Sequence, residues 1–318
     1  MNKTDLKKPL AFGFTTLVFV SMLYLSDFES SIEALGQARH HLLAAGFVLA
    51  NAPVLIYAKV WKNMLHISDI RLSYSSSLKV VLANTFVNNL TPFGNIGGEA
   101  AATLYLSELT GKKKSEIFSA VFSASIINFT PLIILGLTGG MLLGYISLAQ
   151  ILTGLSMIVL ASLWSTYALG VGFSNHLPIR VKRFLSVTAN GLSKLRDRKK
   201  EVVFLLLLTH IAALSSIASV HVIGLSLGYN LSIPLLVLAM PLARIGNYAP
   251  TPGGSVAYEA ALTGILTYLF PVSLQSAALI TAIYRAITYY TGIITGYIGV
   301  SMLEFEGENL FNEDKGET

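Results

Sequence analysis

The sequence predicts an all-α polytopic membrane protein with about six full transmembrane helices and two re-entrant helical hairpins of opposite orientation, an arrangement typical of an inverted repeat. Of its 318 residues, 53% are hydrophobic and only 12% are charged, and the mean hydropathy is +0.64. A soluble domain carries about 25% charged residues. We therefore expect one integral membrane domain over residues 1–303 and an acidic cytoplasmic tail over 304–318.

Stretches without a formal charge predict the full spans, because one membrane-spanning helix needs about 20 apolar residues. These stretches are Leu10–Ser26, Leu42–Ala58, Ile117–Ile179 and Val202–Ala243. The third is long enough for two spans. The first follows three lysines, but another span comes after it, so we interpret it as a retained helix rather than a signal peptide. A final span surrounds Arg285 and completes the six.

Lysine and arginine predict the orientation, since loops rich in these residues stay in the cytoplasm. Segments predicted to be cytoplasmic are the N-terminus, Lys59–Lys79, Lys112–Lys114 and Arg180–Lys200. The opposite loops, Gly228–Ser232 and Phe270–Gln275, have no charge. We expect a multi-pass protein of the plasma membrane with both termini in the cytoplasm. The same clusters explain the net charge of +5 without nucleic-acid binding.

Two apolar segments, about 80–108 and 232–268, are interrupted in their middle and predict the re-entrant hairpins. The interrupting residues include Pro92, Gly97, Gly98, Pro250, Pro252, Gly253 and Gly254. The loop charges predict that the first hairpin enters from the cytoplasm and the second from outside. Paired broken segments of this kind favour a transporter with a binding site near the midplane. Irregular backbone at that depth must be buried in protein or line a wet cavity.

Four charged residues lie inside apolar segments: Glu99, Arg244, Glu259 and Arg285. A charge at the centre of a membrane helix costs about 2.5–3.5 kcal/mol on insertion scales, so each is a candidate functional residue. Glu99 and Glu259 each follow a Gly-Gly break in the first turns of a helix, where the helix dipole favours negative charge. They are either helix-start carboxylates that close their own hairpins or direct participants in substrate or proton handling.

Arg285 and Arg244 suit a phosphate-bearing ligand, because a guanidinium can bind phosphate oxygens bidentately. Thr288 and Tyr289 share the helical face of Arg285. The alternative is a structural ion pair of Arg285 with Glu99 or Glu259. The full set of candidate substrate contacts is Arg285, Arg244, Glu99, Glu259, Asn89, Asn247, Tyr284, Thr288 and Tyr289.

His210 and His221 lie three helical turns apart, so they either form a proton relay or are neutral imidazoles bonded to neighbouring helices. The chain has no cysteine and no P-loop, HExxH or GxSxG motif. We therefore expect no enzyme activity, no metal and no cofactor.

The two broken segments resemble the lysylphosphatidylglycerol synthase transmembrane, or flippase-like, family of bacteria and archaea. The resemblance is carried by Asn88-Asn89-Leu90-Thr91-Pro92 with Gly97-Gly98-Glu99, by Pro250-Thr251-Pro252-Gly253-Gly254 with Glu259-Ala260, and by Tyr284-Arg285 with Tyr289. It implies a membrane domain that moves lipids between leaflets, here as a stand-alone member without the aminoacyl-transferase domain. Members often place a basic residue soon after the Gly-Glu pair, where this chain has Ala100–Leu106.

The leading hypothesis is a lipid flippase that moves an anionic phospholipid or a polyprenyl-phosphate-linked lipid between leaflets. A second hypothesis is a membrane-embedded lipid-headgroup or glycosyl transferase that uses Glu99 or Glu259 as its general base. A third is a non-transporting assembly partner of other membrane proteins. Membrane lipids are the expected partners, and the sequence leaves a homo-oligomer open.

Overall fold

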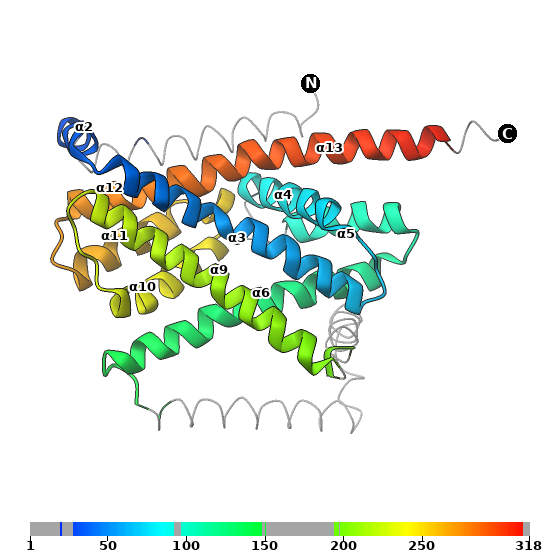
Figure 1. The fold of residues 1–318 in the computed structure, drawn as a ribbon, viewed down its shortest axis with the longest axis horizontal. Coiled ribbons are helices and arrows are strands. Elements are labelled where there is room, and N and C mark those ends of the chain that lie inside the picture. Colours follow the sequence, from blue (N-terminus) through cyan, green and yellow to red (C-terminus); the bar gives the residue numbers. More distant parts are fainter. Residues whose placement is uncertain are drawn as a thin grey trace.

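A computed structural model of the chain describes residues 20, 28–91, 97–147, 150, 194–196 and 198–313, and all regular structure in these residues is helical. The longer helices are α2 (Phe28–Gln37), α3 (His40–Ile67), α4 (Tyr74–Leu90), α5 (Gly97–Thr110), α6 (Lys114–Leu142), α9 (Lys199–Ser226), α10 (Ile233–Ile245), α11 (Ala257–Leu269), α12 (Leu274–Arg285) and α13 (Thr291–Glu313) (Figure 1). The predicted first span and most of the region between 148 and 197 lie outside the described residues.

Four helical segments are long and apolar enough to cross a membrane: His40–Ile67, Lys114–Leu142, Lys199–Ser226 and Leu274–Leu303. Large apolar side chains on these segments point outward, as Leu207 and Ile294 do, with exposed fractions of 58% and 62%. Such a surface suits lipid rather than water. The all-α polytopic prediction is therefore confirmed.

Both interrupted segments fold as pairs of short helices that contact each other, α4 with α5 and α10 with α11. In the second pair, two 3₁₀ turns separate the helices: η2 (Gly246–Tyr248) and η3 (Pro252–Gly254). Gly253 and Gly254 have φ values of +59° and +66°, a backbone conformation that favours glycine. Residues 92–96 of the first break, including Pro92, lie outside the described part. Insertion of the pairs from opposite faces stays a prediction.

Each helix pair belongs to a hydrophobic core of its own. One core contains Leu236, Met240, Leu262 and Ile280 around α10 and α11, and the other surrounds α4 and α5. A long helical rod formed by α12, the π-helical turn η4 (Ala286–Tyr290) and α13 touches both, because α12 packs on α11 and α13 packs on α4 (Figure 1). This rod places the two breaks side by side.

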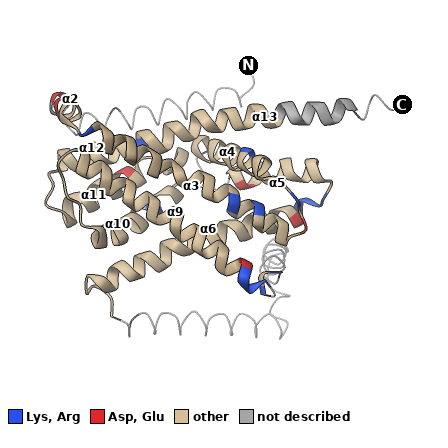
Figure 2. Ribbon diagram, in the orientation of Figure 1, with Lys and Arg blue, Asp and Glu red and all other residues tan. Residues whose placement is uncertain are grey.

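Lysine and arginine gather where α3 ends and where α6 and α9 begin, as Figure 2 shows. Lys59, Lys62, Lys113 and Lys199 belong to this end of the molecule. The distribution has the asymmetry on which the predicted orientation rests. Helix α13 continues to Glu313, so the first ten residues of the predicted tail are helical.

Candidate functional site

A buried ion pair joins the second helix break to the long rod. Arg285, the last residue of α12, donates from Nε to Oε1 of Glu259 in the first turn of α11, at 2.6 Å. The two side chains are only 11% and 7% exposed. Nη2 of Arg285 also donates to the carbonyl oxygen of Gly253 at 3.3 Å. Arg285 thus connects α12, α11 and the left-handed turn between η2 and α11.

Aromatic rings surround the guanidinium of Arg285. Its Cζ lies 4.8 Å from the ring centroid of Tyr258 and 5.3 Å from that of Tyr289. Tyr284 stacks on Tyr258, with ring centroids 6.4 Å apart. A cation held against aromatic faces gains electrostatic stabilisation, and more of it where water is excluded. The rings therefore help to keep a charge on Arg285 inside the protein.

The two helix breaks meet at Tyr289. Its hydroxyl donates to the carbonyl oxygen of Asn89 near the end of α4, at 2.8 Å. A Cβ at Gly253 would contact the Tyr289 ring and would lie 3.3 Å from Oδ1 of Asn89. Glycine is needed there because the backbone of the second break approaches the first so closely. Asn89, Gly253, Tyr289 and Arg285 therefore form one contiguous site.

At the first break, Glu99 is held by neutral donors. Asn88 accepts a hydrogen bond from the backbone N–H of Gly98 at 2.6 Å and places its Nδ2 3.5 Å from Oε2 of Glu99. Ser125 of α6 donates to Oε1 of Glu99 at 3.2 Å. Among the described residues Glu99 has no ion-pair partner. Its carboxylate thus supports the start of α5 and ties it to α6.

Several buried polar atoms near the second break have no hydrogen-bond partner in the described part of the chain. They include Oδ1 of Asn247, the hydroxyl of Tyr258 and Oε2 of Glu259. An unsatisfied buried polar group costs about 1–3 kcal/mol. Buried polar groups are otherwise almost always paired with protein or water. These atoms are thus available to a ligand or to water.

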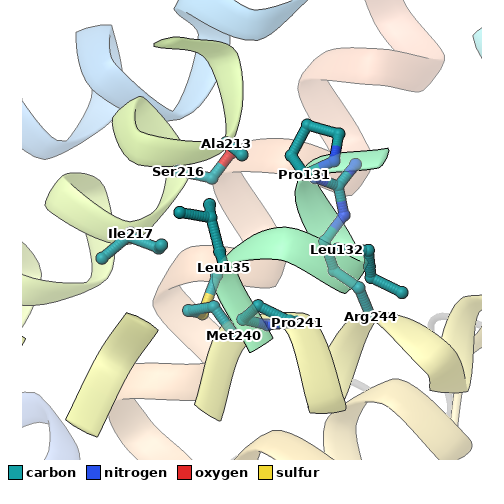
Figure 3. Close-up of a pocket in the computed structure, with 9 residues that line it drawn as sticks. All are labelled: Pro131, Leu132, Leu135, Ala213, Ser216, Ile217, Met240, Pro241 and Arg244. Atoms are coloured by element: carbon teal, nitrogen blue, oxygen red, sulfur yellow. The ribbon is translucent and has the colours of Figure 1, made fainter. Parts of the chain in front are cut away.

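Arg244 of α10 borders a separate, small pocket (Figure 3). The other residues that line it are mostly apolar and come from α6, α9 and α10: Pro131, Leu132, Leu135, Ala213, Ser216, Ile217, Met240 and Pro241. Nη2 of Arg244 lies 3.4 Å from the hydroxyl of Tyr57 on α3. In the described part, no carboxylate pairs with this guanidinium. Arg244 is therefore a cation beside an apolar pocket.

The remaining sequence candidates use their polar atoms within the protein. The hydroxyl of Thr288 donates to the carbonyl of Tyr284 at 2.9 Å. Nδ1 of His210 bonds the carbonyl of Leu206 in its own helix, and Nδ1 of His221 bonds that of Leu231 before α10. A carbonyl only accepts, so both imidazoles carry hydrogen on Nδ1. Whether either histidine relays protons stays a prediction.

Sequence reasoning missed Tyr57, Ser125 and Tyr258 as partners of the charged residues. Tyr258 precedes Glu259 and follows the glycine break, so its position offered a signal. Tyr57 and Ser125 lie within apolar stretches and offered none.

Comparison with known proteins places these features in a family context. Residues 10–296 match the profile of a family described as "Lysylphosphatidylglycerol synthase TM region". UPF0104 membrane protein MJ1595 of Methanocaldococcus jannaschii is 24% identical over 323 residues, covering 92% of this chain and 95% of that protein. UPF0104 membrane protein PH1989 of Pyrococcus horikoshii is 26% identical over 120 residues, covering 37% of this chain and 36% of the relative.

Proposed function

The chain belongs to the lysylphosphatidylglycerol synthase TM-region family, and from that premise we propose that it moves an anionic, phosphate-bearing lipid between the two leaflets. The observation that carries the proposal is the meeting of two helix breaks at a buried guanidinium. Broken helices that meet inside a membrane domain are where transporters of other folds bind their substrates. A phosphate is the lipid group that a guanidinium binds best.

The two arginines would have successive roles. Arg244 has no carboxylate partner in the described part and borders an apolar pocket, so it would be the first cation that a lipid phosphate meets on leaving the bilayer. Arg285 lies at the meeting of the breaks, together with Oδ1 of Asn247 and the hydroxyl of Tyr258, for which the described residues supply no hydrogen-bond partner. The acyl or polyprenyl chains would stay in the surrounding hydrocarbon.

The test is leaflet exchange of fluorescent anionic and zwitterionic lipids in vesicles that contain the purified chain. Arg244→Met and Arg285→Met remove a cation, whereas Arg244→Lys and Arg285→Lys keep the charge and remove the planar fork. We expect each lysine variant to lose at least tenfold in anionic-lipid exchange at normal folded yield. Normal exchange by Arg285→Lys, combined with poor folding of Arg285→Met, would make Arg285 a structural residue only.

Insertion of the two helix pairs from opposite faces is part of the proposal, with both termini in the cytoplasm of a plasma-membrane protein. The chain lacks cysteine, so single cysteines report topology without background. Lys113 and Gln275 are both exposed and lie in the loops predicted to face opposite sides. We expect a membrane-impermeant thiol reagent to label Gln275→Cys, and not Lys113→Cys, in intact cells.

A further inference from the structure

Helices α11 and α12 pack against each other as consecutive helices of a hairpin, and helix periodicity places one threonine of each helix one turn from the ion pair. Glu259 and Thr263 are four residues apart on α11, and Thr281 and Arg285 are four residues apart on α12. Side chains four residues apart share a helix face. Because the two helices run in opposite directions, moving toward the C-terminus of α11 corresponds to moving toward the N-terminus of α12. Thr263 and Thr281 therefore lie level with each other, about 6 Å along the axes from the Glu259–Arg285 pair.

Three oxygens at this interface are buried without a partner in the described part of the chain: Oε2 of Glu259, Oγ1 of Thr263 and Oγ1 of Thr281. The three residues are 6%, 8% and 0% exposed. This is unusual for a helical threonine, which commonly bonds a carbonyl in its preceding turn. Thr267 does so, donating to the carbonyl of Thr263 at 2.9 Å. Two hydroxyls and a carboxylate oxygen without protein partners are polar groups of the kind that buried water bonds.

From this arrangement we infer that Glu259, Thr263 and Thr281 form an internal protonation site, at which proton uptake by Glu259 frees Arg285 to bind the lipid phosphate. The inference rests on the proposed function, because it takes a phosphate-bearing lipid as the second ligand of Arg285. According to this inference, movement of that lipid is coupled to movement of protons.

The charges balance in such a step. A proton delivered through water between Thr263 and Thr281 binds Oε2 of Glu259, and the carboxylate becomes a neutral carboxylic acid. Arg285 then keeps its positive charge and exchanges Glu259 for one phosphate negative charge. The site is neutral before and after, with one proton taken up for each anionic charge bound. Release of the lipid returns Arg285 to Glu259 and returns the proton to water.

The charged and titratable side chains on the elements packed against Glu259 are tyrosines and arginines. They are Tyr258 on α11, Tyr284 and Arg285 on α12, Tyr289 on η4 and Arg244 on α10. The side chains of tyrosine and arginine ordinarily titrate well above neutral pH. On η2, Tyr248 packs its ring against Phe129. The imidazoles of His210 and His221 on α9 bond backbone carbonyls instead.

The experiment uses phosphatidylcholine vesicles that contain the purified chain and a trace of fluorescent phosphatidylglycerol, with an internal pH dye. We expect wild-type exchange to rise at least tenfold between pH 8 and pH 5.5, and a pH gradient to drive lipid to one leaflet with proton flux. Glu259→Gln mimics the protonated acid, so its exchange should be independent of pH and its gradient-driven accumulation should vanish.

The threonines test the delivery of the proton. Thr263→Val/Thr281→Val keeps the shape and removes both hydroxyls, and we expect at least a fivefold loss of gradient-driven accumulation. Thr267→Val is the matched control, because that hydroxyl already bonds its own helix, and it should behave as the wild type. A His210→Gln/His221→Gln variant should keep the pH dependence.

The outcomes separate the two proposals. No lipid exchange at any pH contradicts the proposed function itself. Exchange that is equal from pH 5.5 to 8 and carries no proton flux overturns the protonation site while leaving the flippase intact. If Glu259→Gln folds poorly, the double threonine variant decides, because unchanged gradient-driven accumulation in it also overturns the inference.

Discussion

The first helix break holds Glu99 with an amide and a hydroxyl, whereas the second holds Glu259 with a guanidinium. Each carboxylate lies in the first turn of a helix close to a Gly-Gly pair: α5 begins with Gly97-Gly98, whereas α11 begins three residues after Gly254. Neutral donors can serve either protonation state of an acid, but an ion pair needs the charged form. Under the inferred protonation step, the first break supports the structure and the second changes its charge state.

The largest difference should appear when the cation is removed from the second break. Arg285→Met leaves Glu259 buried without a partner, and breaking a buried pair in this way costs about 3–5 kcal/mol. Thermal unfolding in detergent, followed by intrinsic fluorescence, measures the loss. The double variant Arg285→Met/Glu259→Gln removes both charges and should recover most of it. A single variant as stable as the parent would contradict the assigned pair.

The glycines of the two breaks should respond unequally to alanine. At Gly254, φ is +66° and a Cβ would collide with the backbone of Asn247, which cannot move aside. At Gly97 the described atoms nearest to a Cβ belong to the side chain of Thr91. We expect Gly254→Ala to lose about 2–3 kcal/mol and Gly97→Ala about 1 kcal/mol. Adding Thr91→Ala should rescue Gly97→Ala, and no rescue would show that the contact is not the cause.

Substitutions of Asn88 and Asn247 should distinguish a residue that stabilises the fold from one that contacts the lipid. Asn88 accepts from the backbone of Gly98, so Asn88→Ala should lose about 1–2 kcal/mol of stability, as other caps do. Oδ1 of Asn247 has no partner in the described part, so Asn247→Ala should cost less than about 0.5 kcal/mol. Under the proposed function the second variant loses lipid exchange at full stability. Thermal melting and lipid exchange are measured on both variants. Equal stability and equal exchange of the two would contradict these different roles.

The smallest effect is expected for Glu99→Gln. The amide oxygen can still accept from Ser125, so we expect a stability change below about 1 kcal/mol and an unchanged pH profile of lipid exchange. Thermal melting and the pH profile of lipid exchange are measured for Glu99→Gln and compared with those of Glu259→Gln. A flattened pH profile in Glu99→Gln would assign the protonation to the first break instead.

Most of the fold could be predicted because its helices and breaks are encoded in short segments of the sequence. Proline, glycine and asparagine end helices through their own backbone chemistry, so residues 247–255 could be predicted as a break from sequence alone. The same holds for the long apolar stretches that became α3, α6 and α9. The predicted hairpins at 80–108 and 232–268 differ from the helix pairs at 74–110 and 233–269 mainly in the extent of α4, whose polar first turn Ser75-Ser76-Ser77 has no apolar signal.

The partners within the site depend on which helices are neighbours, and that information is not local. Sequence reasoning left open whether Arg285 pairs with Glu99 or with Glu259, because both acids have the same motif. Packing of α12 on α11 decides in favour of Glu259. The facing pair of Thr263 and Thr281 requires the antiparallel register of two helices, which no single segment reveals.

The π-helical turn of the long rod sets the direction in which its two halves face. In an uninterrupted α-helix Arg285 and Gly292, seven residues apart, would point the same way, since each residue turns the helix by about 100°. In this protein Arg285 faces α11, while Gly292 and Gly296 lie against Thr85 and Phe86 of α4.

The wider turn at 286–290 accommodates one additional residue, so it changes the angular phase between the halves by about 100°. A switch of these five residues to α-helical hydrogen bonding would therefore rotate α12 about the rod axis relative to α13. The guanidinium of Arg285 would move around the rod axis by more than a quarter of a turn, while Gly292 and Gly296 would keep their contacts with α4.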